Sequence, residues 1–76
     1  MPPIKINIVV PYIISCLQFY QGMMKCDTRM IRCYVNKHSG GHYTDEQIRA
    51  LMENHQSRPN TPWWKEIIGG NVYWTL

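Results

Sequence analysis

Four side chains of the types that bind zinc follow one another with the spacing C-x6-C-x4-H-x3-H. They are Cys26, Cys33, His38 and His42. Zinc takes four Cys and His ligands in a tetrahedron, and the two histidines have zinc-finger spacing. The two cysteines do not, because structural sites usually place them about two to four residues apart on one tight turn. A small zinc-binding domain is therefore one alternative, and a buried thiol with two loop histidines is the simpler interpretation.

Other catalytic arrangements have less support in the sequence. A nucleophilic Cys needs an activating His or helix N-terminus, and no recognisable flanking signature accompanies Cys26 or Cys33. The acidic residues form no acid–base pair that we recognise; they are Asp27, Asp45, Glu46, Glu53 and Glu66. The Ser39-Gly40-Gly41 loop lacks the GxxxxGK[ST] and GxGxxG nucleotide-binding motifs. We therefore predict a protein that is not an enzyme and needs no cofactor.

A second group of residues combines positive charge with an aromatic ring. It consists of Lys25, Arg29, Arg32, Tyr34 and Lys37. We expect residues 28–35 to form a strand whose Arg32 and Tyr34 point away from the core. Basic and aromatic side chains on an exposed sheet face are what single-stranded nucleic-acid binders use. Nucleic-acid binding is thus an alternative function, although neither an RRM-type run nor a helix-turn-helix pair is evident in the sequence.

The adjacent pair Trp63-Trp64 points to a protein partner. Adjacent residues on a helix point about 100° apart, so both indoles are buried only if the helix is nearly engulfed. An exposed Trp beside Lys65 and Tyr73 would be a binding hot spot. The other interpretation is that both Trp fill the core together with Trp74. The predicted contact residues are Trp63, Trp64, Lys65 and Tyr73, with the Arg29, Arg32 and Tyr34 face.

Length and composition indicate one compact domain over residues 1–76. Apolar residues make up 45% and charged residues 17%, which favours a packed core over disorder. The net charge of +3 falls short of a nucleic-acid signature by itself. Three cysteines cannot all pair within one chain, so we expect reduced thiols and a cytoplasmic location.

The clearest local structure is a helix within residues 43–55. Thr44 is a good N-cap, and Gln47 three residues later completes a capping box. Asp45 and Glu46 favour the positive end of the helix dipole. Ile48, Leu51, Met52 and His55 then form a single stripe that must be covered.

The other elements are assigned from hydrophobic periodicity. Strict alternation predicts strands at 4–10, 28–35 and 72–76, and helical spacing predicts helices at 12–21 and 61–68. The last of these begins at Thr61-Pro62 and ends before Gly69-Gly70-Asn71. The resulting fold is a small α+β domain of order β-α-β-α-α-β, with a three-stranded sheet and helices packed on one face. A strand at 72–76 on the sheet edge could pair with its copy in a dimer.

The N-terminal segment has two competing interpretations. Its apolar run is too short for a membrane span and Pro11 interrupts it. Ile13-Ile14-Ser15-Cys16 resembles the lipobox of a lipoprotein signal ending before Cys16. Asn7 and Pro11 and the period of two favour a strand followed by a helix instead.

The leading functional hypothesis is a protein-binding module. In its small size, aromatic content and absence of a catalytic motif, the chain is similar to the inhibitory proteins that phages and mobile elements encode. Such proteins bind and disable a host machine, for example a restriction, CRISPR or transcription complex. The chain differs from the acidic DNA mimics of that group because it is basic. The resemblance implies an inhibitor or regulator of a host defence or nucleic-acid-processing complex.

Overall fold

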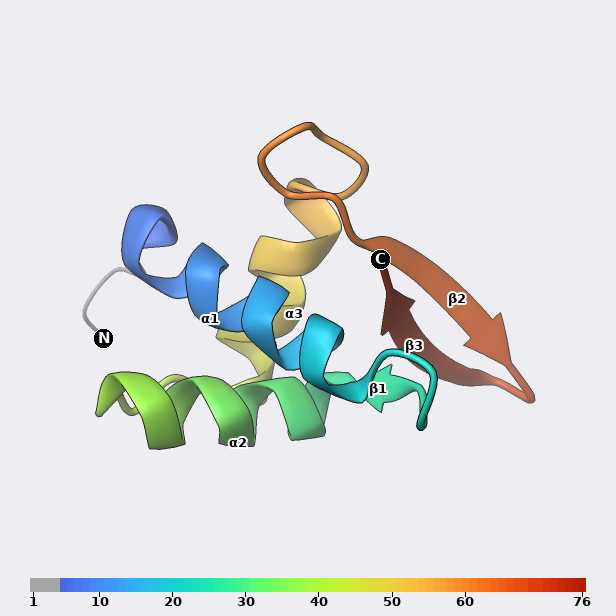
Figure 1. Ribbon diagram of the computed structural model, residues 1–76, viewed down its shortest axis with the longest axis horizontal. Coiled ribbons are helices and arrows are strands. Elements are labelled where there is room, and N and C mark those ends of the chain that lie inside the picture. The colour runs from blue at the N-terminus through green and yellow to red at the C-terminus, as the bar shows by residue number, and fades with distance from the viewer. Residues whose placement is uncertain (1–4) are drawn as a thin grey trace.

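The computed structural model describes residues 5–76 and shows a three-helix body from which a β-hairpin projects (Figure 1). Its elements are α1 (Ile6–Tyr20), β1 (Cys26–Asp27), α2 (Thr28–Ser39), α3 (Asp45–Asn54), β2 (Trp64–Ile68) and β3 (Asn71–Thr75). The predicted α+β class with a three-stranded sheet is confirmed. The predicted order was wrong, because the chain runs α-β-α-α-β-β.

The sheet is antiparallel with the strand order β1-β3-β2. β3 is therefore the central strand, which corrects the prediction that residues 72–76 lie at a sheet edge from which they could pair with a second copy. Cys26 lies opposite Trp74 on one side of β3, and Lys65 lies opposite Trp74 on the other. Gly69 and Gly70 connect β2 to β3 with φ values of 57° and 81°. Two consecutive positive φ angles are what a two-residue hairpin turn requires.

Helix α1 covers residues that we had assigned to a strand at 4–10 and a helix at 12–21. Residue 4 lies outside the described residues. The run is apolar on nearly every side, so it fits both periods, and packing against α2 selects the helix. Val9, Ile13, Cys16 and Leu17 form its buried stripe. Pro11 lies inside the helix on an exposed position, where its missing N–H costs one backbone hydrogen bond.

Helix α2 replaces the predicted strand at 28–35. Its buried positions Ile31 and Val35 are four residues apart, whereas Cys33 between them is exposed. The Asp27 carboxylate caps the N-terminus by accepting the Met30 N–H at 2.8 Å. Gly40 ends the helix in the left-handed conformation, with its N–H donating to the Asn36 carbonyl at 3.0 Å. These two caps were the sequence signals that the alternating pattern obscured.

Strand β2 replaces the predicted helix at 61–68. Thr61 is no helix cap here; its hydroxyl donates to the His55 carbonyl and closes the connection after α3. Residues 64–68 then pair along their whole length with β3. Gly-Gly between two runs rich in β-branched and aromatic residues is a hairpin signal, and it outweighs the Thr-Pro start of a helix.

Helix α3 confirms the prediction for its segment. The Thr44 hydroxyl accepts the Gln47 N–H at 3.1 Å and the Gln47 side chain accepts the Thr44 N–H at 2.9 Å, which completes the capping box. Ile48, Leu51 and Met52 are buried as predicted.

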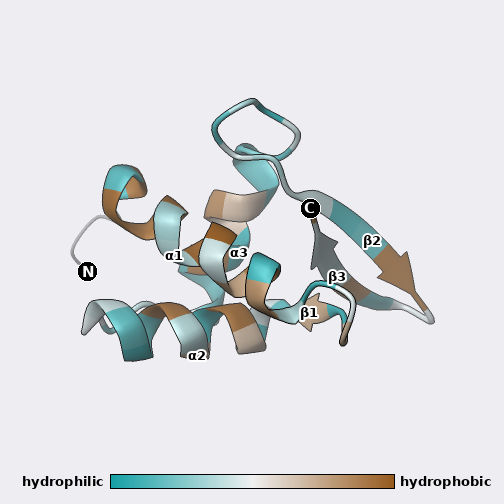
Figure 2. Ribbon diagram, in the orientation of Figure 1, coloured by the Kyte–Doolittle hydropathy of each residue, from teal (hydrophilic) through white to brown (hydrophobic). Residues whose placement is uncertain are grey.

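The core lies between the three helices and the inner face of the sheet. α1 and α2 pack side by side, while α3 crosses behind them (Figure 1). Hydrophobic positions of the helices meet in the centre, and a further apolar segment marks the far end of β2 (Figure 2). The buried apolar residues are Val9, Ile13, Cys16, Leu17, Cys26, Ile31, Val35, Ile48, Leu51, Met52, Trp63 and Trp74. Within residues 5–76, no helix has the length and apolarity needed to cross a bilayer.

We expect the Asp27 cap to be a measurable part of stability. Replacing Asp27 with Ala leaves the Met30 N–H without its acceptor and should lower the free energy of unfolding by about 1 kcal/mol. Asp27→Asn keeps a side-chain oxygen and should retain most of the stability. Urea denaturation of both variants tests this, and an Ala variant as stable as the Asn variant would contradict it.

Candidate functional site

The four potential zinc ligands do not come together. Cys26 is buried on β1, whereas Cys33 is exposed on α2. His38 lies in the last turn of α2 against the ring of Tyr34, and His42 lies in the following loop. Within residues 5–76, no group of three His, Cys, Asp or Glu side chains has the arrangement of a metal site. The zinc alternative therefore has no structural basis in this part of the chain.

Two of the three thiols, Cys16 and Cys26, are buried. Burial raises the pKa of Cys16 from 9.0 to about 12, and the neighbouring Cys26 thiol adds to the rise. Burial also raises the pKa of Cys26. Since the thiolate is the nucleophile, neither thiol is prepared for catalysis. Cys16 also belongs to a helix that contributes Val9 and Ile13 to the core, so residues 6–15 before it are part of this fold.

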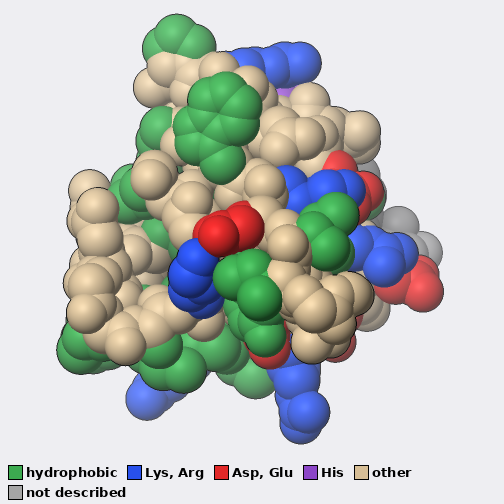
Figure 3. Space-filling model, turned by 90° about the vertical axis from the view of Figure 1, so that its right-hand side faces the viewer, with side chains coloured by type: hydrophobic (Ala, Val, Ile, Leu, Met, Phe, Trp, Pro, Cys, Tyr) green, Lys and Arg blue, Asp and Glu red, His purple; other side chains and the backbone are tan. Residues whose placement is uncertain are grey.

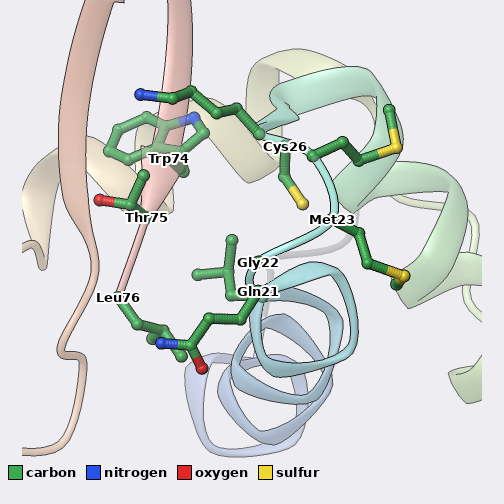
Figure 4. A pocket seen from close by; sticks show the side chains of 10 residues that line it. Gln21, Gly22, Met23, Cys26, Trp74, Thr75 and Leu76 are labelled. Atoms are coloured by element: carbon green, nitrogen blue, oxygen red, sulfur yellow. The ribbon is translucent and has the colours of Figure 1, made fainter.

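A cavity of about 370 Å³ opens between the end of α1, the segment leading to β1 and the end of β3 (Figure 4). Leu76 and Gln21 line one side, and Trp74 and Cys26 line the other. Its polar lining side chains are Gln21, Lys25 and Thr75. An amide, a lysine and a hydroxyl do not make an acid–base pair, so this cavity offers no catalytic constellation.

The three tryptophans divide between the core and the surface. Trp63 is fully buried, and its Nε1–H donates to the Met52 carbonyl at 2.8 Å. Trp74 is 1% exposed and donates to the Thr28 hydroxyl at 3.1 Å. Trp64 is 57% exposed. The prediction that Trp63 contacts a partner is therefore wrong, because a strand directs adjacent side chains to opposite faces, whereas Trp64 remains available.

The sheet presents one uncovered face, which we call the outer sheet face. Cross-strand neighbours share a face, so Trp64 lies with Thr75, Glu66 with Tyr73, and Ile68 with Asn71. The opposite face carries Trp74 and Cys26 into the core. On β2 and β3 the outer sheet face consists of Trp64, Glu66, Ile68, Asn71, Tyr73 and Thr75, and Asp27 of β1 lies beside Tyr73.

Charged groups border these apolar side chains. The Lys25 Nζ lies 2.7 Å from the Glu66 Oε1, and both side chains are partly exposed. Figure 3 views the molecule from the hairpin side and shows hydrophobic side chains at the surface with acidic and basic side chains beside them. Lys65, predicted to join Trp64, instead lies on the opposite face of β2 and pairs with Glu53 of α3 at 3.3 Å.

The predicted basic and aromatic group separates into three places. Lys25 pairs with Glu66 beside the sheet, and Arg32 pairs with Asp45 at 2.5 Å between α2 and α3. That ion pair raises the pKa of the Arg32 guanidinium, which is charged in any case. The remaining three, Arg29, Tyr34 and Lys37, line a groove of about 610 Å³ between α1 and α2. The expected sheet face is therefore a helix face.

That groove, here called the α1/α2 groove, contains residues that the sequence analysis missed. Phe19, Tyr20 and His38 join Tyr34 there. Ile68 was likewise missed on the outer sheet face. A sequence signal for Ile68 did exist. Once a hairpin is recognised at Gly69-Gly70, Ile68 lies four residues after Trp64 on the same strand, and residues four apart on a strand share a face. No local signal links Phe19 to His38, because only the packing of α1 on α2 brings them together.

Helices α2 and α3 are consecutive and joined by residues 40–44, a pairing that the strand assignment at 28–35 concealed (Figure 1). In helix-turn-helix proteins the second of two consecutive helices enters the DNA major groove. The exposed charges of α3 are Asp45, Glu46, Arg49 and Glu53. Three acids and one base would repel DNA phosphates, so α3 is poorly suited to groove reading.

No known family model, curated protein or solved structure matches this chain. The function is therefore inferred from the surfaces described above.

The different environments of the adjacent tryptophans give a stability prediction. Trp63→Phe removes the buried indole N–H and leaves a void, and it should lower the free energy of unfolding by about 2 to 3 kcal/mol. Trp64→Phe should change it by less than about 0.5 kcal/mol. Urea denaturation followed by circular dichroism measures both, and equal losses in the two variants would contradict the assignment.

The thiols give a prediction on reactivity and pH. At about pH 8, Cys33 should react with a thiol reagent in the native protein, while Cys16 and Cys26 should react only after unfolding. The pKa of Cys16 is higher in the folded chain than its ordinary 9.0, so the folded state holds this proton more tightly. Its contribution to stability is complete below about pH 9 and is lost as the pH rises towards 12. Three fast-reacting native thiols would refute this.

Proposed function

We propose that this chain is a non-enzymatic protein-binding module that contacts its partner with the outer sheet face and with the hairpin tip, residues 67–70. The observation that carries the proposal is the set of large apolar side chains left uncovered on β2. Trp64, Ile67 and Ile68 are 57%, 64% and 44% exposed. A domain this small needs its large hydrophobic residues in the core, so this exposure favours a role in binding over a role in folding.

The geometry of the hairpin supports this role. β2 and β3 extend away from the helices, and the Gly69-Gly70 turn forms the outermost point of the hairpin (Figure 1). On the outer sheet face, Trp64 and Ile68 are separated by Glu66, with Tyr73 opposite it. Side chains two residues apart on one strand face, or opposite across a strand pair, are close enough to fill one partner surface.

The composition of this surface matches what binding hot spots contain. Trp and Tyr are enriched in such sites because rigid rings bury much area at little entropic cost. The Lys25–Glu66 ion pair at their border is solvent-exposed and contributes little stability, but it would orient a partner at the rim. We infer a partner with an apolar pocket for Trp64.

The role we propose is inhibitory or regulatory. In its small size, its aromatic content and its lack of a catalytic motif, this basic chain is similar to the phage and mobile-element proteins that disable host defence or nucleic-acid-processing complexes. A basic inhibitor would occupy acidic or aromatic protein surface rather than imitate DNA. We propose a cytoplasmic location, where its three unbridged cysteines would stay reduced.

The test is affinity capture of the tagged protein from host lysate, with and without nuclease, read by mass spectrometry. We expect a discrete protein complex that survives nuclease. Trp64→Gln combined with Ile68→Gln should abolish capture, because it removes apolar contact area while leaving the core residues in place.

The matched control is Ile8→Gln, which alters an exposed apolar residue of α1 far from the hairpin. It should capture the complex as the wild type does. Circular dichroism confirms that each variant is folded. A complex retained by the double variant, or lost equally with Ile8→Gln, would refute the outer sheet face as the binding site.

A further inference from the structure

We infer that the α1/α2 groove binds an unpaired stretch of nucleic acid, with bases stacked on its rings and phosphates on its basic rim. The site adjoins the outer sheet face at Asp27 but uses other side chains, and it does not depend on the function proposed for that face. Its members come from the end of α1 and the exposed side of α2, and those used here are Phe19, Tyr20, Arg29, Tyr34, Lys37 and His38.

The rings form a continuous series through the groove. The Phe19 and Tyr20 rings meet edge to face with centroids 4.9 Å apart. The ring centroids of Phe19 and Tyr34 are 6.5 Å apart. Those of Tyr34 and His38 are 4.2 Å apart, with an angle of 37° between the ring planes. Tyr20 and Tyr34 are half-buried against the core, so they hold the series in place while its outer rings face solvent.

The exposed ring is available for stacking. The chain has one phenylalanine, Phe19, and its apolar side chain is 60% exposed where a core position would be expected. Its ring touches the two tyrosines at the surface and adds little to the core. A flat apolar ring at the mouth of a groove is the feature on which an unpaired base stacks, whatever its sequence.

Two cations border the rings. Arg29, Cys33 and Lys37 follow at intervals of four on α2, so they form one stripe along the groove. Arg29 and Lys37 are about 12 Å apart along the helix axis, with the small Cys33 side chain leaving room between them. Neither cation takes part in an ion pair among residues 5–76, unlike Lys25, Arg32 and Lys65.

One acidic residue offsets part of this charge. The Asp27 carboxylate, which caps α2 through the Met30 N–H, also lines the groove, so Arg29 and Lys37 leave it with one positive charge in excess. The groove is therefore cationic and aromatic together, which fits a ligand that alternates phosphates and flat rings. In a duplex the base faces are stacked on one another and cannot stack on the rings. The carboxylates of an acidic peptide would pair with the cations but would not stack on the rings. A single strand contacts both the cations and the rings, so we take it as the ligand.

The test is fluorescence anisotropy of the full chain with labelled oligo(dT) and oligo(U) of about twelve nucleotides, between about 50 and 200 mM salt. Phe19→Leu keeps an apolar surface but removes the ring, and it should weaken binding about tenfold at every salt concentration. Lys37→Gln should lower the slope of log affinity against log salt by about 0.7, the share of one phosphate contact.

The matched control is Arg58→Gln, which removes the same charge from the exposed loop that follows the C-terminal end of α3. The affinity of this variant should lie within about twofold of the wild type, and its slope of log affinity against log salt should differ by less than about 0.2. Circular dichroism checks the fold of each variant. The hairpin variant Trp64→Gln should bind the oligonucleotides normally, which separates this site from the proposed protein-binding surface.

Several results would overturn the inference. Undetectable binding at about 50 mM salt would do so, as would full affinity in Phe19→Leu. Equal effects of Lys37→Gln and Arg58→Gln would show general charge attraction without a site. Competition by polyglutamate, or by duplex DNA, as effective as by the single strand would reassign the groove to an acidic peptide or to duplex DNA.

Discussion

The buried indole of Trp74 joins the two halves of this molecule. It lies on the central strand, opposite Cys26 of β1 on one side and Lys65 of β2 on the other. Its N–H donates to Thr28 in the first turn of α2, so one side chain attaches the sheet to the helices. Trp63 makes the equivalent attachment to α3 through the Met52 carbonyl. With both indoles inside, the hairpin is held at its base while its tip extends past the core.

This attachment explains why the outer sheet face is open. The helices of a 76-residue chain cover only the base of the inner face, around Trp74, and leave Ile67 nearer the hairpin turn 64% exposed. No element among residues 5–76 lies over the other face. Trp64 therefore faces solvent because its neighbour Trp63 faces the core. The exposed tryptophan and the buried one are two consequences of the same strand geometry.

The two candidate surfaces meet at β1. Asp27 caps α2 next to the α1/α2 groove and also lies opposite Tyr73 of the outer sheet face. Phe19 and His38 form the groove only because α1 packs on α2, so the sequence analysis recognised Arg29, Tyr34 and Lys37 but assigned them to a sheet. It likewise recognised Trp64 and Tyr73 but missed Ile68, because it expected a helix where β2 lies.

By itself, the sequence determined local features that no competing pattern obscured. The capping box of Thr44 and Gln47 is one, since each cap bonds to a backbone group three residues away. The Asp27 and Gly40 caps of α2 are equally local, but the alternating pattern of residues 28–35 obscured them. The helical form of the run after Ile6 and the strand form of residues 64–68 were decided by tertiary structure. The first is apolar enough to satisfy either period, and the second became a strand because β3 offers it a full ladder of hydrogen bonds. In both segments, contacts with residues distant in the sequence stabilise a structure that local preference alone does not select.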